Sequence, residues 1–424
     1  MRSLAVLSMH TSPLAQPGTG DGGGMNVYVR ELATALARTG VRCDVYTRSS
    51  SPHLAAVVAV EPGLHVHHVA AGPTAPVAKE DLAQLVPAFT RGVLTRMTTG
   101  HPADAIHANY WLSGLAGHSL KHELDLPLVS TFHTLDRVKA EVDLSENEER
   151  RSQAELEVMG CSDAILASCD DEVAQLVRLY RAEASRIEVV PLGVDHAFFA
   201  PNPASLRAAS PPRAARGQAR RALGLPEDGR LVLFVGRIQP LKGLEVAVRA
   251  LAELSGAGPA RGPEPSLVVV GGPSGPAGVA EVERMHDLVH RLGLGRRVRF
   301  VAPQPHELLS TFYRAADVCI VPSRSESFGL VALEAAACGT PVVASAVGGL
   351  TSLVRDGETG LLVDSRDPRR FAEALATLLD DDELAAEMGR RAARHARGYT
   401  WPLAAGRLRR LYAKLTARQL VECP

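Results

Sequence analysis

The strongest constraint on the fold is a regular alternation of short apolar runs and longer amphipathic stretches, which continues through almost the whole chain. Runs of about four to eight residues rich in Val, Ile and Leu are typical of buried strands, and the stretches between them have helical length. Strands that alternate with helices form βαβ units, whose strands lie parallel in one sheet. The pattern therefore predicts an α/β fold with parallel sheets.

The alternation runs twice along the chain. In the first run the expected strands are 3–9, 41–47, 56–70, 104–108, 127–131, 163–168 and 187–190. The helices expected between them are 26–39, 80–98, 111–123, 146–160 and 170–182. In the second run the expected strands are 230–235, 266–271, 297–301 and 360–363, besides the stretch 317–345, which has the order strand, loop, helix, turn and strand. The helices expected there are 243–254, 277–292, 305–314, 348–355, those within 367–398, and 401–420.

Residues 201–219 interrupt the alternation, because they are rich in Pro, Ala and Arg and have no apolar period. This composition indicates a linker or a surface insertion, and we favour a solvated connector over a phosphate-binding patch. A chain of 424 residues is also too long for one ordinary core. We therefore predict two domains, residues 1–200 and 201–400. Two open parallel sheets that face each other would form a ligand-binding cleft at the carboxyl ends of their strands.

The net charge, the length of the apolar runs and the spacing of the cysteines indicate what the protein binds, where it is located and whether its cysteines are paired. The net charge is −1, which gives no indication of binding to nucleic acid or to an anionic membrane. We expect a cytoplasmic protein, because no export signal and no apolar run of transmembrane length is found. The cysteines form no Cys-x-x-Cys pair, so we expect reduced thiols and neither a disulfide frame nor a zinc site. The six cysteines are Cys43, Cys161, Cys169, Cys319, Cys338 and Cys423.

The stretch 317–345 carries the first candidate site. Glu326 lies in the predicted loop before a helix, and Glu334 lies about two turns into that helix. The unpaired backbone amides at the helix start favour an anion, and flanking carboxylates would accept hydrogen bonds from sugar hydroxyls. The alternative is a solvated loop glutamate and an ordinary helix-face glutamate. The amides in question are those of Phe328, Gly329 and Leu330.

A second candidate site follows the first strand of the second domain, in the loop from Gly236 to Gly243. Arg237 and Lys242 lie in this loop, and a guanidinium group together with an ammonium group suits a diphosphate. Both cations would stabilise the charge that develops on a diphosphate leaving group. The alternative is a pair of solvated loop residues.

The glycine-rich loop after the first strand formally contains G-x-G-x-x-G at Gly18, Gly20 and Gly23. Eight residues separate the first strand from Gly18, and no acidic residue ends the second strand, so a dinucleotide site is disfavoured. We interpret the loop as a flexible cover over a ligand phosphate, opening a helix. His133, at the end of strand 127–131, is a further candidate, although a core or surface histidine is the more frequent case.

Together these residues resemble the retaining glycosyltransferases of glycosyltransferase family 4, which have the GT-B fold. The resemblance covers nearly the whole chain, and its most specific motifs are the Glu326–Glu334 spacing with Ser327-Phe328-Gly329-Leu330, the loop Gly236-Arg237…Lys242-Gly243, and Gly339-Thr340-Pro341. Residues 10–29 most closely resemble the inositol-3-phosphate N-acetylglucosaminyltransferases of mycothiol synthesis and, more loosely, sucrose-phosphate synthases.

The resemblance implies a role for each matching residue. Glu326 would hold the hydroxyls of the donor sugar, Glu334 those of the ribose, and His133 would lie beside the anomeric carbon. The implied donor-binding residues are Gly23, Gly236, Arg237, Lys242, Glu326, Phe328, Gly329, Leu330 and Glu334. The implied acceptor-binding residues are Asn26, Lys79, Tyr110, Thr134 and Arg151. The implied catalytic residues are His133, Arg237, Lys242 and Glu326. The helix within 401–424 would cross back to the first domain.

The expected activity is transfer of a sugar, with retention, from a UDP-sugar such as UDP-GlcNAc to a small phosphorylated polyol such as inositol-3-phosphate. Alternatives are a sucrose-phosphate-synthase-like or GDP-mannose-dependent transferase, a Rossmann oxidoreductase, and a non-catalytic sugar-binding protein. No Asp-x-Asp motif is found, so no metal or other cofactor is expected. The chain is compatible with a homodimer. Three departures from the family pattern bear on substrate choice: Asn109, Asp136-Arg137 and Pro303-Gln304-Pro305.

Overall fold

The computed structural model describes residues 2–18, 22–142, 149–202, 212–256, 264–274 and 278–423. The chain divides into two compact units. Unit 1 comprises Met1–Ala15, Gly22–Gly193 and Trp401–Pro424, and unit 2 comprises Gln16–Asp21 and Val194–Thr400. Unit 1 is therefore built from segments that come before and after Val194–Thr400 in the sequence. No helix among the described residues has the length and apolar character needed to cross a membrane.

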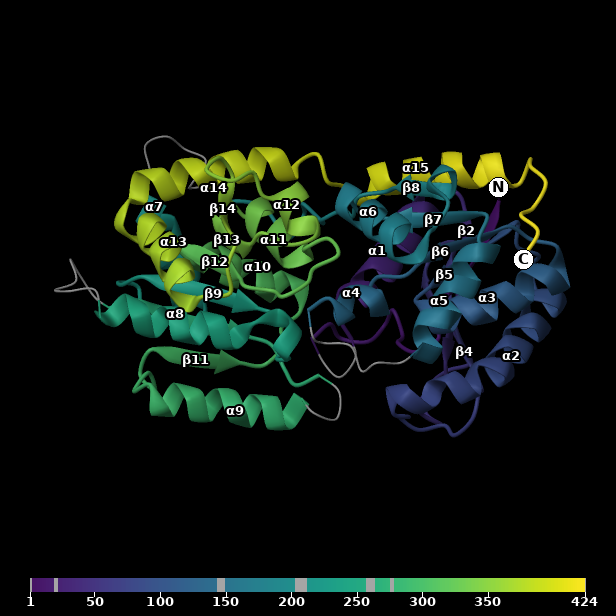
Figure 1. Ribbon diagram of the computed structural model, residues 1–424, viewed down its shortest axis with the longest axis horizontal. Helices are drawn as coiled ribbons and strands as arrows, with labels where there is room; N and C mark the ends of the chain where they lie inside the picture. Colours follow the sequence, from purple (N-terminus) through teal and green to yellow (C-terminus); the bar gives the residue numbers. More distant parts are fainter. Residues whose placement is uncertain are drawn as a thin grey trace. The chain divides into compact units, whose positions relative to one another are not determined.

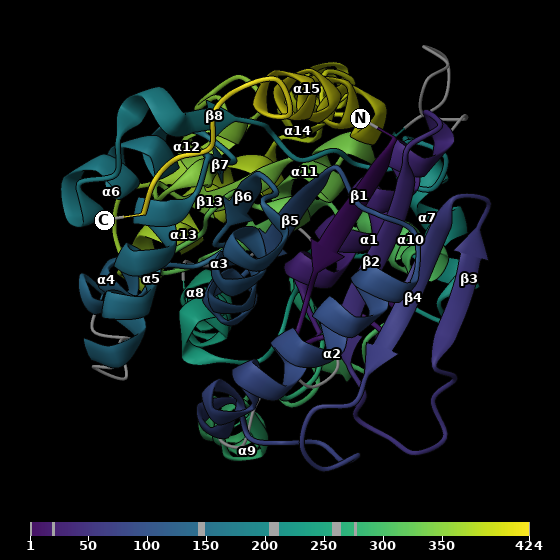
Figure 2. The ribbon, with the colours of Figure 1, turned by 90° about the vertical axis from the view of Figure 1, so that its right-hand side faces the viewer.

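The sheet of unit 1 has the strand order β3-β4-β2-β1-β5-β6-β7-β8. Its strands are β1 (Ser3–Leu7), β2 (Arg42–Arg48), β3 (Val57–Glu61), β4 (Leu64–Val69), β5 (Ala105–Asn109), β6 (Leu128–Thr131), β7 (Ala164–Ala167) and β8 (Ile187–Val189). All neighbours pair in parallel except β3 and β4 at the edge of the sheet, which are antiparallel (Figure 2). Only Pro62 and Gly63 connect these two strands, which is too short for a parallel crossover. The predicted parallel sheet is confirmed for the other strands of this sheet, and β3 at its edge is the exception.

The longer helices of unit 1 lie where the amphipathic stretches predict them, whereas the short helices α4 and η2 were not predicted. They are α1 (Gly24–Arg38), η1 (Lys79–Leu85), α2 (Val86–Thr99), α3 (Trp111–Leu124), α4 (Asp136–Ala140), α5 (Glu149–Cys161), α6 (Asp170–Tyr180), η2 (Ala184–Arg186) and α15 (Trp401–Leu415). Helix α15 packs along α1 (Figure 1), with the rings of Tyr28 and Trp401 6.2 Å apart. The hydroxyl of Tyr412, buried in α15, lies 2.8 Å from Nδ1 of His107 in β5. The end of the chain is thus part of the core of unit 1.

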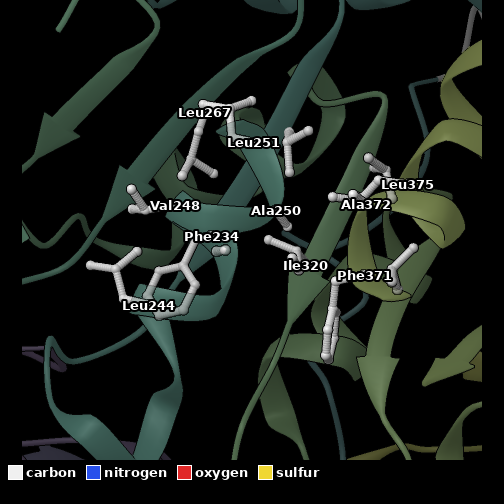
Figure 3. Packing of buried hydrophobic residues seen from close by; sticks show 14 of the residues in the cluster. Phe234, Leu244, Val248, Ala250, Leu251, Leu267, Ile320, Phe371, Ala372 and Leu375 are labelled. Atoms are coloured by element: carbon white, nitrogen blue, oxygen red, sulfur yellow. The ribbon is translucent and has the colours of Figure 1, made fainter. Parts of the chain in front are cut away.

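The sheet of unit 2 is parallel throughout, with the order β11-β10-β9-β12-β13-β14. Its strands are β9 (Leu231–Val235), β10 (Ser266–Val270), β11 (Val298–Val301), β12 (Val318–Val321), β13 (Val342–Ser345) and β14 (Gly360–Val363). Its helices are α7 (Pro212–Ala222), η3 (Pro240–Lys242), α8 (Leu244–Gly256), α9 (Gly278–Arg291), α10 (His306–Ala315), α11 (Leu330–Ala337), α12 (Gly349–Leu353), α13 (Pro368–Asp380) and α14 (Asp382–Ala396). Figure 3 shows side chains of α8 and α13 packed around Phe234 and Ile320 of the sheet.

Two sequence expectations need correction. The solvated connector expected at 201–219 is wrong from Pro212 onward, because α7 begins there and Arg216 pairs with Asp317 at 3.0 Å. Residues 203–211 of that stretch lie outside the described part of the chain. The expectation that all six cysteines are reduced is also wrong, because Cys161 and Cys423 form a disulfide. The other cysteines are free and buried: Cys43, Cys169, Cys319 and Cys338.

Candidate functional site

The candidate donor site of unit 2 lies at the point where the strand order reverses. Strand β9 has β10 on one side and β12 on the other, so the chain leaves β9 and β12 through loops that begin side by side. Open α/β sheets bind ligands outside the carboxyl ends of strands at such a reversal. The loops after β9 and β12 are the stretches 236–243 and 322–329, which contain the sequence motifs.

Lys242 and Glu326 come together at this edge of the sheet. The ammonium nitrogen of Lys242 lies 2.6 Å from Oε2 of Glu326, and the hydroxyl of Ser323 donates to the same oxygen at 3.2 Å. Gly243 makes this approach possible, since its φ is +70° and a Cβ there would lie 2.0 Å from the carbonyl oxygen of Pro322. A non-glycine residue would therefore push the two loops apart.

Arg237 lies on the β10 side of the same reversal. Its Nη1 donates to the hydroxyl of Ser274 at 3.0 Å, in the loop that follows β10. The loops after β9 and β10 touch, because a Cβ on Gly271 would lie 1.9 Å from the carbonyl oxygen of Gly236. The two cations predicted to hold a diphosphate thus both lie in the loop after β9, where the loop after β10 contacts Arg237 and the loop after β12 contacts Lys242.

The start of α11 is the third part of this site. Its N-cap, Gly329, has a φ of +99°, and a Cβ there would lie 3.7 Å from Cγ of Glu326. Among the described residues, the amides of Phe328, Gly329 and Leu330 have no hydrogen-bond partner. Unpaired amides at a helix start next to a lysine form an anion-binding arrangement.

Gly348 and Gly349 position Glu326 and were missed by the sequence analysis. The amide of Gly349 donates to the carbonyl oxygen of Glu326 at 2.9 Å, and a Cβ on Gly348 would lie 2.0 Å from that oxygen. The signal that could have revealed them is a pair of glycines shortly after the strand that ends at Ser345.

Glu334 is buried, whereas the side chain of Glu326 keeps a small exposed fraction, 17%. The hydroxyl of Tyr313 donates to Oε2 of Glu334 at 2.8 Å. Burial raises the pKa of Glu334 to about 7, against the opposing effect of this hydrogen bond. Its predicted role toward ribose hydroxyls stays a prediction, and that role requires the ionised form to accept two hydrogen bonds.

The candidate acceptor site of unit 1 lies at the corresponding reversal, between β1 and β5. Tyr110 follows β5 and His133 follows β6, and both have the left-handed backbone conformation, with φ of 76° and 62°. Non-glycine residues in this region cost about 1–3 kcal/mol and often mark functional sites. The rings of His10, after β1, and Tyr110 lie 4.4 Å apart.

Arg151 joins Tyr110 and Thr134 into one cluster. Its Nη2 donates to the carbonyl oxygen of Thr134 at 2.8 Å, and its guanidinium lies over the Tyr110 ring at 5.1 Å. Glu155, which is fully buried, holds Nε of Arg151 at 2.8 Å and therefore fixes the guanidinium. Arg151 and Glu155 lie four residues apart on α5, a spacing typical of exposed helical ion pairs, but both side chains are buried.

Asn26 acts within its own loop. Its Oδ1 accepts from the amide of Gly23 at 2.9 Å, and its Nδ2 donates to the hydroxyl of Thr11 at 2.6 Å and to the carbonyl of Ser12. These bonds hold the glycine-rich loop at the start of α1. Lys79 begins η1, and its side chain lies outside the described part of the structure.

His133 is held beside the acceptor cluster. Its Nε2 lies 2.9 Å from Oδ1 of Asn109, and its ring meets the Tyr28 ring edge-on at 4.9 Å. Burial lowers the pKa of His133 to about 3, with a further contribution from His107. The imidazole is therefore neutral at physiological pH.

Comparisons with known proteins match the two parts of the chain to two family models. Residues 22–198 match the family model described as Glycosyltransferase Family 4, and residues 215–395 match the model described as Glycosyl transferases group 1. The D-inositol 3-phosphate glycosyltransferase of Kineococcus radiotolerans is 49% identical over 416 residues, which cover 95% of this chain and 92% of that protein. The enzyme of the same name from Corynebacterium efficiens is 45% identical over 98% of this chain and 96% of its own.

A solved structure is similar over the same extent. The sucrose-phosphate synthase from Thermosynechococcus elongatus has a TM-score of 0.88 and 35% identity, and the match covers 98% of this chain and all of that one. Two α/β domains of this kind are characteristic of the GT-B fold.

Proposed function

Because the chain belongs to glycosyltransferase family 4, we propose that it transfers N-acetylglucosamine from UDP-GlcNAc to inositol 3-phosphate with retention of the anomeric configuration. The proposed acceptor is inferred from the buried cluster of Arg151, Thr134 and Tyr110. A guanidinium that is fixed by Glu155 and flanked by two hydroxyl-bearing side chains suits a phosphate monoester. The names of the relatives from Kineococcus and Corynebacterium support the same acceptor.

The donor would bind at the loops after β9 and β12. Lys242, Arg237 and the amides at the start of α11 would hold the diphosphate, and Glu326 would accept hydrogen bonds from sugar hydroxyls. The contact between Lys242 and Glu326 at 2.6 Å supports this proposal, because it would hold the ammonium group beside the bound diphosphate. These groups stabilise the charge that develops on the diphosphate as its bond to the sugar breaks.

The proposed reaction proceeds on one face of the sugar. The bond from the anomeric carbon to the diphosphate oxygen breaks, the bond to the acceptor oxygen forms, and the acceptor proton passes to the leaving diphosphate. His133 would contribute as a neutral hydrogen-bonding group, because an imidazolium ion would repel the positive charge developing at the anomeric carbon. We propose that the reaction needs no metal ion.

The test is a matrix of donors and acceptors incubated with the full chain. Product formation from UDP-GlcNAc and inositol 3-phosphate, detected by mass spectrometry, is expected, with the anomeric configuration read by NMR. Fructose 6-phosphate is included because of the sucrose-phosphate synthase similarity, and GDP-mannose tests the other donor base. Turnover only with fructose 6-phosphate or only with GDP-mannose would contradict the proposed substrates, and no transfer from any donor would contradict the proposed activity.

Variants separate the two sites. Lys242→Ala should lower kcat by about a hundredfold or more, because it removes charge stabilisation in the transition state. Arg151→Ala should raise KM for the phosphorylated acceptor by at least tenfold while the KM for the donor stays unchanged. Lys414→Ala, on the exposed side of α15, is the matched control and should keep wild-type kinetics.

A further inference from the structure

A cluster of metal-ligating side chains lies in unit 1, apart from the residues assigned to donor and acceptor. It consists of His118 and His122 on α3, Cys161 at the end of α5, and Cys423 in the segment after α15. Their potential ligand atoms all lie within 4.8 Å of one another. No part of the proposed transfer reaction uses these four residues.

The distances within this His118/His122/Cys161/Cys423 cluster are close to those of a tetrahedral zinc site, which would form once the disulfide between the two cysteines is reduced. Nε2 of His122 lies 3.0 Å from Sγ of Cys423, and Nε2 of His118 lies 3.3 Å from Sγ of Cys161. In a tetrahedral site with Zn–S of about 2.3 Å and Zn–N of about 2.0–2.1 Å, neighbouring ligand atoms are about 3.3–3.8 Å apart. Two thiolates and two imidazoles are also a common structural zinc set.

Glu157 provides the second observation that points to a metal. Its Oε1 lies 3.0 Å from Nδ1 of His118, the ring nitrogen that faces away from the sulfur. A carboxylate that accepts from one nitrogen of a histidine fixes the tautomer whose other nitrogen carries the lone pair, and metal-binding histidines regularly have such a partner. A disulfide between Cys161 and Cys423 makes no use of this arrangement.

The two cysteines are held in place by bonds that do not involve sulfur. Lys121 donates to the carbonyl oxygen of Cys161 at 2.8 Å and to Oδ2 of Asp163 at 2.9 Å. Oδ1 of Asp163 accepts from the amide of Val421 at 2.7 Å. Asp163 therefore links the segment that carries Cys423 to the end of α5, so reduction would leave both thiols facing the two histidines.

We propose that the reduced protein binds one Zn²⁺ ion through Cys161, Cys423, His118 and His122, and that the disulfide is the oxidised, metal-free form of the same site. Reduction by a thiol reagent transfers two electrons and two protons to the disulfide, which yields two cysteine thiols and one reagent disulfide. Zinc binding then releases the two thiol protons to solvent and forms two Zn–S bonds. The ion would tie the segment after α15 to α3 and α5.

Cobalt(II) titration of the reduced full chain, followed by zinc competition, tests this proposal. The expected result is one ion per chain, with the visible absorption bands of a tetrahedral cobalt–thiolate site that zinc abolishes. Cys423→Ser should remove the bands, and His122→Ala should weaken cobalt binding by at least tenfold. Glu157→Gln should lower the affinity by about 10–100-fold, as for other carboxylates that support a metal-binding histidine.

Two control variants keep the test specific. His101→Ala changes an exposed histidine outside the cluster, and Cys169→Ser changes a cysteine at the N-cap of α6, where serine is well tolerated. Both should bind cobalt as the wild type does, and circular dichroism confirms that every variant is folded. The proposal is overturned if the reduced wild type takes up no cobalt or zinc, or if Cys423→Ser binds as tightly as the wild type. The readout is independent of glycosyl transfer, so failure of either proposal leaves the other intact.

Discussion

Glu326 and Glu334 show how two identical side chains of one motif acquire different properties. Glu326 keeps partial access to solvent and pairs with Lys242, whereas Glu334 is buried against Tyr313. Folding raises the pKa of Glu334 from 4.5 to about 7. Between these pH values Glu334 is protonated in the folded protein but ionised in the unfolded chain. The free energy of unfolding therefore falls as the pH rises through this window.

Glu334→Gln should remove this pH dependence. Relative to the wild type, the variant should gain about 1–3 kcal/mol in the unfolding free energy of unit 2 between pH 4.5 and pH 8, because glutamine carries no charge to bury. Urea denaturation at both pH values measures the difference, and Glu373→Gln, at an exposed glutamate of α13, is the control. An equal effect of Glu334→Gln at both pH values would contradict the raised pKa.

Most helices and strands were predictable because each one carries its own apolar period. The antiparallel edge of β3 and β4 was not, although Pro62-Gly63 is a local signal for a tight connection. Helix α7 was missed because ion pairs anchor it: Arg216 and Arg220 both bind Asp317, and such contacts leave no periodic pattern.

The residues of the candidate site that follow the ends of strands could be predicted from the sequence. Those that depend on tertiary contacts between loops could not. Lys242 and Glu326 lie far apart in sequence, and the rule that ligands bind at a reversal of strand order brings them together. The support of Glu326 by Gly348 and Gly349 depends on packing between two loops. The disulfide joins residues 262 positions apart, so no local pattern could indicate it.

Helices α8 and α13 share one core with the sheet of unit 2, and Phe371 of α13 lies within it (Figure 3). Phe371→Ala should lower the unfolding free energy of unit 2 by about 3–5 kcal/mol, through lost burial and the cavity left behind. Thermal or urea denaturation measures the loss, and Leu403→Ala, at an exposed leucine of α15, should change little. A loss below about 1 kcal/mol would show that α13 contributes little to this core.

The chain as a whole is arranged so that its last helix completes its first domain. Deleting residues 401–424 removes Tyr412, the partner of His107, and exposes the α1 surface around Tyr28. Hydrogen exchange should then accelerate in β1 and β5 of unit 1, while β9 and β12 of unit 2 stay protected. Deleting only residues 416–424 keeps α15 but removes Cys423, so this control separates the loss of the disulfide from the loss of the helix. Unchanged exchange in β1 and β5 after the longer deletion would contradict this view of α15.

The position of α15 also sets an order of events during protein synthesis. All of Val194–Thr400 leaves the ribosome before Trp401 does, so unit 2 has its complete set of strands while unit 1 still lacks one helix. Nascent unit 1 therefore exposes the apolar side of α1 throughout translation of the second half of the chain. That interval is the period in which a growing polypeptide of this kind most needs protection by chaperones.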